Sequence, residues 1–402
     1  MLRYDGQFGG SMFEFRGVDF MEFDSLLSEE ELLVRQTARQ FVEDRFIPLI
    51  TRHFREGTFP EELTAPIAEL GFFGANLDGY GCAGLSNVEY GLVMQEMERG
   101  DTALRSFVSV QGSLSMYAVH SYGSDEQKAR WLPRMQQGKA MGCFALTEPN
   151  FGSNPGGMIT RAVPDGDGYV VNGEKTWITN GSVADIAVIW AKVGDSDRIQ
   201  GFLVETDRPG FTAVDLHNKL SMRASTTSAV GLSNVRIPAE NVLPGAKGLK
   251  AALGCLTNAR LGIAWGAIGA AMACYDCARQ YAILRTQFDD RPIASHQLVQ
   301  AELADMITEI TKAQFITLHA TRLKDRGRSH HAHVSMIKRG NAAMALDVAR
   351  RARDLLGANG ITDEYPIFRH MCNLETVKTY EGTHNIHTLV LGSHVTGIHA
   401  FT

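Results

Sequence analysis

The sequence predicts an α+β protein, mostly α, built from three successive domains. We expect a helical domain over residues 1–140, a β-domain over 141–248 and a four-helix bundle over 249–402. Two changes in hydrophobic period predict this order: helical spacing gives way near Met141 to short β-branched and aromatic runs, and it returns after about Gly248. No strand alternates regularly with a helix, so the β-domain is predicted to be a sandwich or barrel.

The first domain contains clear helix boundaries. Ser28 and Glu31 have the spacing of a capping box, and apolar residues follow at helical intervals. Further helices are predicted over residues 61–70, 88–98, 107–122 and 124–137. Gly100 and Asp101 predict that one helix ends and another begins between Glu98 and Arg105.

The β-domain is predicted from short runs separated by turn residues. These runs cover residues 143–147, 169–172, 176–179, 186–191, 202–205 and 235–238. Asn172-Gly173 is predicted to be a hairpin turn. The last domain is predicted to contain helices over 251–285, 296–326, 333–356 and 386–396, joined by short links.

Composition and charge exclude several classes of protein. A hydrophobic content of 44% and a charged content of 21% are ordinary for a globular enzyme, and a net charge of −6 argues against a nucleic-acid partner. Residues 261–274 are apolar but too short for a membrane span, so their glycines are predicted to allow close helix packing. The six dispersed cysteines favour a reducing compartment; Cys274 and Cys277 are interpreted as helical core residues, and no metal site is predicted.

The N-terminal residues have no targeting pattern. Acidic residues interrupt every apolar run before Asp24, which argues against a signal peptide and against a mitochondrial transit peptide. A cytoplasmic location is therefore expected, or the mitochondrial matrix if a transit peptide has been removed.

Glu381 is a candidate general base. It precedes Gly382 on a predicted turn, and Thr383 is a plausible N-cap for the helix that follows. A carboxylate on a turn at the edge of a rigid helix can be reached by a ligand, and apolar surroundings would raise its pKa. The alternative is an ordinary surface glutamate near a helix start.

Two groups of residues are candidates for binding a flat heterocycle and its phosphates. The strand-to-loop segment 144–153 and the strand residues 177–179 offer backbone groups, hydroxyls and an aromatic plane; the alternative is a loop with a core tryptophan. Arg285 could pair with a phosphate, and the glycine-containing turn at 355–360 could approach a pyrophosphate; the alternatives are helix ends. No Gly-x-Gly-x-x-Gly motif follows a strand, so a dinucleotide would not bind in the Rossmann manner.

For two further groups of residues, a functional site is weighed against an ordinary structural or solvated role. Glu98 and Arg105 lie near Ser106 and Ser109, and a surface ion pair is the alternative to a site. His330, His331 and His333 are interpreted as solvated loop residues rather than metal ligands.

Together these motifs resemble the acyl-CoA dehydrogenases. The resemblance covers about residues 23–402 and rests on Phe144-Ala-Leu-Thr-Glu-Pro, Trp177-Ile-Thr, Asn258-Ala-Arg, Arg285-x-Gln-Phe and Tyr380-Glu-Gly-Thr-His, in this order. It implies the family's α-domain, β-domain, α-domain fold with bound FAD, a homotetramer whose neighbouring subunits complete each flavin site, and an electron-transfer flavoprotein as the acceptor. No nucleic acid and no membrane span are implied.

The resemblance also implies roles for individual residues. Glu381 would remove the α-proton of an acyl thioester, a β-hydride would pass to the flavin, and the Glu381 N–H and a flavin hydroxyl would bind the thioester oxygen. The residues implied to contact FAD are Phe144, Leu146, Thr147, Gly152, Ser153, Trp177, Ile178, Thr179, Arg285, Gln287, Phe288, Gln297, Asp354, Leu355, Gly357 and Thr383. Asn154 and Ala358 depart from the residues that the family usually has in the flavin loops.

The implied substrate is glutaryl-CoA. Arg105, with Ser106 and Ser109, matches the residues that hold the distal carboxylate in family members acting on this diacid thioester, and Glu98 and Tyr380 match the decarboxylating members. The other implied substrate contacts are Ser153, Leu253, Asn258, Arg260 and Gly382. The resemblance thus predicts oxidation and decarboxylation to crotonyl-CoA. A short-chain monoacyl-CoA dehydrogenase, a non-decarboxylating enzyme and a non-catalytic flavin or CoA-ester binder are the alternatives.

Overall fold

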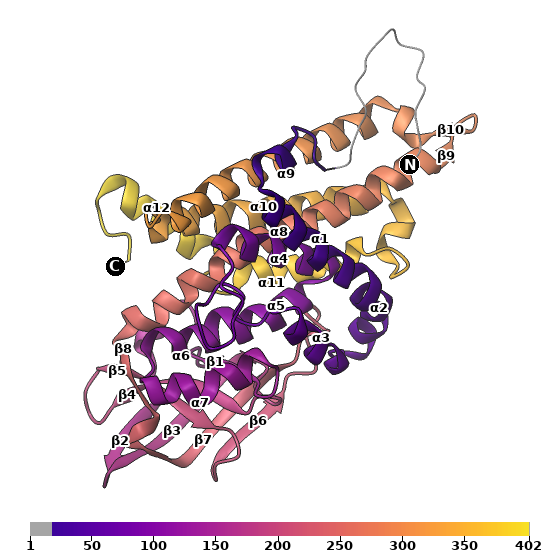
Figure 1. Ribbon diagram of the computed structural model, residues 1–402. Coiled ribbons are helices and arrows are strands. Elements are labelled where there is room, and N and C mark those ends of the chain that lie inside the picture. The colour runs from indigo at the N-terminus through magenta and orange to yellow at the C-terminus, as the bar shows by residue number, and fades with distance from the viewer. Residues whose placement is uncertain (1–17, 402) are drawn as a thin grey trace.

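The protein has a sheet at one end and a long helical bundle at the other, with the N-terminal helices between them on one side (Figure 1). The structure, a computed structural model, describes residues 18–401. The predicted fold class is therefore confirmed. The exact domain boundaries at 140/141 and 248/249 stay predictions, and the first seventeen residues of the predicted helical domain lie outside the described residues.

The N-terminal helices form because capping residues start them. Ser28 accepts a hydrogen bond from the N–H of Glu31, whose carboxylate accepts one from the N–H of Ser28, which confirms the predicted capping box. Asp101 caps α5, so the predicted break after Glu98 is also confirmed. The helices are α1 (Glu29–Phe41), α2 (Ile47–Glu56), α3 (Thr64–Glu69), α4 (Asn87–Gly100), α5 (Thr102–Ser109), α6 (Tyr117–Tyr122) and α7 (Asp125–Gln136).

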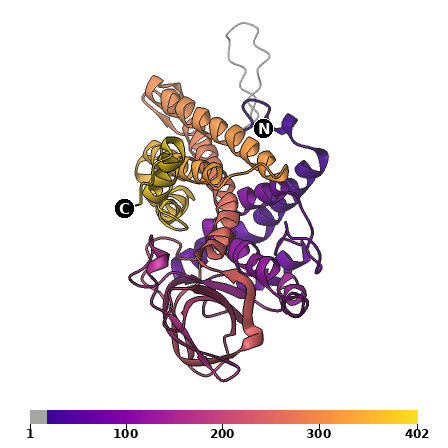
Figure 2. The same cartoon turned by 90° about the vertical axis from the view of Figure 1, so that its left-hand side faces the viewer.

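The β-domain is a strongly curved sheet that curls into a barrel-like ring when viewed from the side (Figure 2). Its strands are β1 (Gly142–Ala145), β2 (Arg161–Asp165), β3 (Gly168–Thr179), β4 (Ile186–Val193), β5 (Ile199–Glu205), β6 (Phe211–Asp215), β7 (Thr227–Pro238) and β8 (Val242–Lys247). The order is β6-β7-β3-β2-β4-β5-β8, and β1 pairs in parallel with β4. Sequence analysis missed β2, β6 and β8; β2 and β6 are short and mostly outside the core, so burial left a weak pattern.

The hairpin predicted at Asn172-Gly173 is wrong. Both residues lie within β3, which is one long strand whose pairing with β7 shifts register at this point. The Asn172 side chain accepts a hydrogen bond from the N–H of Asn234 at 2.8 Å, so it bridges the two strands instead of making a turn. A Cβ at residue 173 would collide with Thr160, and glycine is therefore required by close packing.

The C-terminal helices are α8 (Leu249–Leu284), α9 (Gln297–Asp325), α10 (His331–Leu355), α11 (Ile367–Thr379) and α12 (His384–Thr396), and the short strands β9 (Thr286–Gln287) and β10 (Arg291–Pro292) form a hairpin. Sequence analysis missed α11. Its core-facing side includes Arg369, His370 and Asn373, which are buried, so polar residues interrupt the apolar pattern that reveals the other helices.

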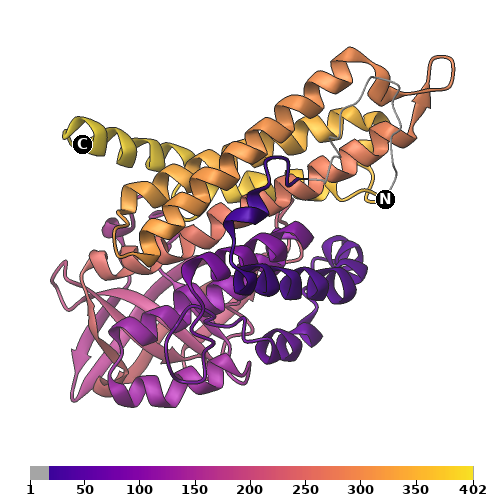
Figure 3. The ribbon, with the colours of Figure 1, turned by 45° about the horizontal axis from the view of Figure 1, so that its top comes forward.

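Helix α8 crosses the molecule and joins the helical regions (Figure 3). Gly266 and Gly269 face α4, where an added Cβ would collide with Glu98 and with the backbone of Gln95. Their close-packing role is thus confirmed. Within the described residues, α8 alone has the length and composition of a membrane-crossing helix, but 83% of its most apolar stretch is buried inside the protein.

Candidate active site

Glu381 lies on the tight turn between α11 and α12. Thr383 accepts a hydrogen bond from the N–H of Ile386, which confirms it as the N-cap of α12. Glu381 has φ 49° and Gly382 has φ 91°, so two successive residues of the turn lie in the left-handed region. This conformation costs a residue with a side chain about 1–2 kcal/mol, so surrounding contacts must hold it.

Side chains from three helices hold the carbonyl groups of this turn. Arg260 of α8 donates from Nε to the oxygen of Glu381 at 2.7 Å, and Lys338 of α10 donates from Nζ to the oxygens of Tyr380 and Gly382, both at 2.8 Å. His387 of α12 has Nε2 3.2 Å from the oxygen of Glu381. Burial lowers the pKa of His387 to about 3, so its imidazole is neutral and we assign the proton to Nε2. Three consecutive carbonyls are therefore fixed.

The Glu381 carboxylate has the environment of a base. Its Oε2 is buried and lacks a hydrogen-bond partner among the described residues. Burial raises the pKa of Glu381, whereas the positive charges of Arg260, Arg105 and Lys338 lower it; the net shift is upward. A carboxylate with a raised pKa and a free oxygen can take a proton from a bound ligand.

Arg105 and Glu98 form a buried ion pair beside this turn. The Arg105 side chain is 1% exposed and Glu98 is fully buried, so the alternative of a surface ion pair is wrong. Arg105 donates from Nε to Glu98 at 2.6 Å and from Nη2 to the hydroxyl of Tyr380, the residue before Glu381. Thr102 donates to the other oxygen of Glu98 at 3.0 Å. Within the described part of the chain, Nη1 of Arg105 has no hydrogen-bond partner.

Two serines next to Arg105 are also buried. Ser106 and Ser109 are 2% and 1% exposed, and the hydroxyl of Ser109 has no partner among the described residues. Tyr90, which sequence analysis missed, forms a hydrogen bond with Ser113 at 2.5 Å, and burial raises the pKa of Tyr90. The structure thus brings Glu98, Arg105 and Tyr380 together directly before Glu381, and their roles as site residues stay predictions.

Lys338 and His387 were also missed by sequence analysis. Lys338 follows Val334 by four residues and precedes Ala342 by four, and both are buried, so it lies on the apolar face of α10. Because lysine is rarely buried, its position on an apolar helix face could have marked Lys338 as a candidate functional residue in the sequence. His387 gave no comparable signal; one of its two partners, Ser335, lies 52 residues away in the chain.

The candidate flavin-ring residues lie at the edge of the sheet that begins with β1. Phe144, Leu146 and Ile178 are buried, and Thr147 and Thr179 are half-buried. Trp177 is 63% exposed with φ 60°, so the alternative of a core tryptophan is wrong. Gly152 and Ser153 are exposed in the neighbouring loop.

A buried ion pair shapes this loop. Lys175 donates to Glu148 at 2.9 Å and to the carbonyl of Leu146 at 3.1 Å, and burial lowers the pKa of Lys175 to about 8. Glu148 also accepts from the N–H groups of Ile159 and Thr160. The loop that carries the candidate flavin contacts is therefore fixed at its base.

The candidate phosphate and adenosine residues lie elsewhere. Arg285, Gln287, Phe288 and Gln297 are exposed around the β9–β10 hairpin, at the opposite end of the molecule from the sheet (Figures 1 and 3). Asp354, Leu355 and Gly357 lie where α10 ends. In one chain, the two halves of the predicted FAD site are therefore not brought together.

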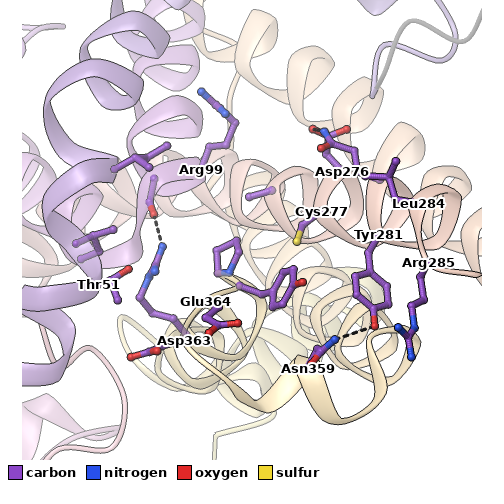
Figure 4. Close-up of a pocket in the computed structure, with 18 residues that line it drawn as sticks. Thr51, Arg99, Asp276, Cys277, Tyr281, Leu284, Arg285, Asn359, Asp363 and Glu364 are labelled. Atoms are coloured by element: carbon purple, nitrogen blue, oxygen red, sulfur yellow. Dashed lines mark hydrogen bonds between the residues drawn. The ribbon is translucent and has the colours of Figure 1, made fainter. Parts of the chain in front are cut away.

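A cavity of about 690 Å³ lies between α2, α8 and the segment before α11. Arg285 lines it together with Tyr281, and Asn359 donates to the Tyr281 hydroxyl at 3.0 Å (Figure 4). Glu381 and Arg105 do not line it. It is thus separate from the candidate active site.

Three other predicted substrate contacts, Leu253, Asn258 and Arg260, lie on α8. Arg260 binds the turn itself, as described above. Asn258 is buried and accepts a hydrogen bond from Lys324 at 2.7 Å, and Leu253 is 38% exposed on the same helix. Their predicted contacts with CoA stay predictions.

The interpretation as loop residues is wrong for His331 and His333. His330 caps α10 and its ring stacks on that of His394, with centroids 4.5 Å apart, while His331 and His333 belong to the first turn of the helix. No cluster of metal ligands occurs among residues 18–401, and the predicted absence of a metal site stays a prediction.

The residues on the sheet edge fit a flavin. An indole that is mostly exposed and held in a left-handed backbone conformation offers a flat apolar surface, and the hydroxyls of Thr147 and Thr179 lie on adjacent backbone. Phe288, at 79% exposed, and Arg285 offer a second aromatic ring and a cation for the nucleotide end.

Family profiles match most of the chain. The N-terminal domain of acyl-CoA dehydrogenase matches residues 28–139, the middle domain matches 143–235 and the C-terminal domain matches 246–396. The chain is 35% identical over 375 residues to the mitochondrial short-chain specific acyl-CoA dehydrogenase of Bos taurus, covering 92% of this chain and 90% of that protein.

Solved structures are similar over nearly the whole chain. The crystal structure of glutaryl-CoA dehydrogenase from Mycobacterium smegmatis has 50% sequence identity and a TM-score of 0.94, covering 96% of this chain and all of that chain. A glutaryl-CoA dehydrogenase from the same organism, solved in complex with FADH2, has 49% identity and a TM-score of 0.92, covering 94% of this chain and 97% of that chain.

These comparisons support the predicted reaction class and cofactor. The family is one of flavin enzymes that bind FAD, and the residues at the sheet edge fit this cofactor. The chain therefore belongs to the acyl-CoA dehydrogenase family.

Proposed function

We propose that this protein catalyses the FAD-dependent oxidative decarboxylation of glutaryl-CoA to crotonyl-CoA and CO2. The observation that carries the proposal is the buried Arg105, which hydrogen-bonds Tyr380 directly beside the base. A buried cation at the far end of an acyl site would be left without its ligand by a monoacyl chain, whereas a diacid thioester supplies a carboxylate. Similarity to two glutaryl-CoA dehydrogenases supports the same substrate.

The first step is proton abstraction by Glu381. Its unpartnered Oε2 takes the α-proton of the thioester, and the developing negative charge on the thioester oxygen is bound by the N–H of Glu381. Within the described part of the chain this N–H has no hydrogen-bond acceptor of its own. Bound FAD would supply the acceptor for the hydride that leaves the β-carbon, with Phe144–Ser153 and Trp177–Thr179 holding its ring.

The second step is loss of CO2 from the unsaturated thioester. Arg105 binds the distal carboxylate through Nη1. Glu98 offsets most of the positive charge of Arg105 and so keeps this carboxylate from being bound too tightly. The carbon–carbon bond to the carboxylate breaks, CO2 leaves, and the electron pair passes into a dienolate conjugated with the thioester. Glu381, which is now protonated, returns a proton to the terminal carbon and gives crotonyl-CoA.

A short-chain monoacyl-CoA dehydrogenase is the second candidate. The 35% identity to a short-chain enzyme favours it, and Arg105 would then have a purely structural role. Under both candidates we propose an electron-transfer flavoprotein as the acceptor. We also propose a cytoplasmic location, or the mitochondrial matrix for a chain that has lost a transit peptide.

We further propose a homotetramer whose subunits share FAD sites. The support is the separation of the two groups of predicted FAD residues, which lie at opposite ends of one chain (Figure 1). A neighbouring subunit would supply Arg285, Gln287 and Phe288 to the nucleotide end of a flavin whose ring lies at the sheet edge.

The deciding experiment identifies the acyl product by mass spectrometry after incubation with glutaryl-CoA and an artificial electron acceptor. Crotonyl-CoA is expected. Glutaconyl-CoA would refute decarboxylation and keep the dehydrogenation, and unchanged glutaryl-CoA with rapid oxidation of butyryl-CoA would favour the second candidate. Arg105→Met is expected to lose glutaryl-CoA oxidation by about a hundredfold or more, because a buried charged hydrogen bond is lost, while butyryl-CoA oxidation is retained or gained.

A further inference from the structure

We infer that Lys338 is a positioning residue for both chemical groups of Glu381, its carboxylate and its backbone N–H. This inference rests on the proposed catalytic role of Glu381 and not on the identity of the acyl chain. Lys338 does not touch the substrate in this account and acts only through the turn.

The first observation is where the ammonium group binds. Its two acceptors are the carbonyls of Tyr380 and Gly382, one on each side of Glu381, both at 2.8 Å. The lysine is 1% exposed and lies in the first half of α10, a helix that packs against α8, α11 and α12. A single rigid side chain thus clamps the turn at both ends.

The second observation is that the clamped turn is strained. Glu381 has φ 49°, a conformation that glycine adopts readily and a glutamate does not. Without Lys338 the carbonyls of the turn would keep only the side-chain bonds from Arg260 and His387, and both of these go to the carbonyl of Glu381 itself. The two flanking peptide groups would then be free to rotate, and the carboxylate would lose its direction.

The third observation concerns the peptide unit between Tyr380 and Glu381. The Tyr380 carbonyl that accepts from Lys338 belongs to the same conjugated amide as the N–H of Glu381. A cation at the carbonyl oxygen draws electron density through the amide and makes that N–H a stronger donor. Lys338 would therefore strengthen the donor that binds the developing oxyanion.

The charge of Lys338 also bears on the base. Burial lowers the pKa of Lys338 to about 7, and the negative charge of Glu381 opposes this shift. In return, the positive charge of Lys338 lowers the pKa of Glu381. The titratable and charged groups around Lys338 are Glu381, Tyr380, Arg260, Arg105, Glu98, His384 and His387.

The test compares Lys338→Met, which keeps an unbranched apolar side chain without the ammonium group, with Lys338→Gln, which keeps N–H donors without charge. The matched control is Arg339→Met on the same helix, which removes a cation and a bond to Thr388 of α12 but leaves the turn untouched. Two assays are made on FAD-loaded protein: oxidation of the acyl-CoA that the wild type uses, and deuterium uptake from D2O into the α-position of acetyl-CoA. Acetyl-CoA has no β-carbon, so its exchange reports the base and the oxyanion donor alone.

For Lys338→Met we expect at least a tenfold loss of both kcat and α-exchange, with KM changed less than about threefold. The acid limb of kcat/KM should move to higher pH, because removing the cation raises the pKa of Glu381. A merely structural lysine would lower stability without moving this limb. Should Lys338→Met fail to fold, Lys338→Gln decides, with the same shift of the limb expected.

Two results would overturn the inference in different ways. Folded, FAD-loaded Lys338 variants with wild-type exchange and an unmoved acid limb would refute the role of Lys338 alone. A wild-type protein that neither exchanges the α-hydrogens nor oxidises any acyl-CoA would refute the proposed role of Glu381, and this inference with it.

Discussion

At the scale of single residues, the chemistry depends on how the surroundings of Glu381 change its proton affinity. Burial removes water from the carboxylate, and three cations partly compensate without touching Oε2. The carboxylate of Glu381 can therefore stay ionised, while its raised pKa gives it a higher proton affinity than an exposed glutamate has. Arg105 and Glu98 differ from Glu381, because each has the other as a buried ion-pair partner at 2.6 Å.

Replacing Glu381 by glutamine removes the base and keeps the size of the side chain. We expect kcat to fall by about 10²–10⁴-fold, the usual contribution of a positioned general base. FAD content and thermal stability should remain near those of the wild type. Glu375→Gln, an exposed change on α11, is the control and should retain activity. Unchanged turnover in Glu381→Gln would remove Glu381 from the mechanism.

The pH dependence of the wild type follows from the shift of the Glu381 pKa. The base acts when ionised, so kcat/KM should fall as the pH drops through the pKa of Glu381. Because burial raises this pKa above the ordinary value of 4.5, the fall should begin at a higher pH than for an exposed glutamate. The profile of kcat/KM against pH measures it, and an acid limb at or below the ordinary value would contradict the burial argument.

The buried ion pair makes a prediction about stability. Arg105→Met leaves Glu98 buried without its cation, which should destabilise the fold by about 3–5 kcal/mol. In the double variant Glu98→Gln/Arg105→Met no charge is left unpaired, so most of that loss should be recovered. Denaturant unfolding of the three proteins measures the difference. Equal losses in the single and double variants would show that the desolvated carboxylate is not the cause.

At the scale of elements, the buried carboxylate of Asp101 joins α5, which carries Arg105, to α11, which precedes Glu381. Asp101 caps α5 through the N–H of Ala103 at 2.7 Å, and it accepts from Arg369 at 2.8 Å and Asn373 at 2.9 Å on α11. Arg105 follows one turn later on α5, and Glu381 follows the end of α11. The distance between these two groups is therefore set by Asp101.

Asp101→Asn is expected to keep the cap and lose the charge that pairs with Arg369. We expect a loss of about 2–4 kcal/mol of unfolding free energy, because a buried cation loses its partner, together with a higher KM. Ser124→Ala, which removes the cap of the peripheral helix α7, should lose only about 1 kcal/mol and leave KM unchanged. Similar effects of the two substitutions would argue against a special role for Asp101.

At the scale of the whole molecule, the two groups of predicted FAD residues lie at opposite ends of the chain (Figure 3). In a single subunit, Trp177 therefore lies at one end of the molecule and Arg285 at the other. A shared site accounts for the exposure of two aromatic side chains, Trp177 at 63% and Phe288 at 79%. In a lone chain, exposing these rings to water would bring no stabilisation.

Mixed assemblies test whether subunits share sites. Trp177→Ala and Arg285→Ala should each lower FAD content as homo-oligomers. When equal amounts are co-assembled, about a quarter of the sites should combine an intact Trp177 from one subunit with an intact Arg285 from another and regain FAD. Sedimentation gives the assembly and absorbance gives the FAD content. No recovery on mixing, in assemblies of confirmed mixed composition, would mean that each chain builds its own site.

The sequence by itself determined the order of the three regions, and its motifs, through their resemblance to the acyl-CoA dehydrogenases, predicted the reaction class and the roles of Glu381 and Arg105. Local periodicity, caps such as Ser28, and motifs on single segments are properties of neighbouring residues, so no long-range contact is needed to recognise them. Helix α11 was missed because its buried polar residues find their partners far away in the chain, at Gly100 and Asp101 and at Met222. The hairpin at Asn172 was wrongly predicted because a cross-strand bond and close contact with Thr160 override the turn preference.

Only the tertiary structure decided which charged side chains are buried and which partners they have. Whether Glu98 and Arg105 form a solvated pair or a desolvated one depends on α8 covering them, and that contact joins residues far apart in sequence. The same is true of Lys338, whose two acceptors lie 42 and 44 residues further along the chain. Burial and pairing at long range are set by packing, and these decide pKa values and hence chemistry.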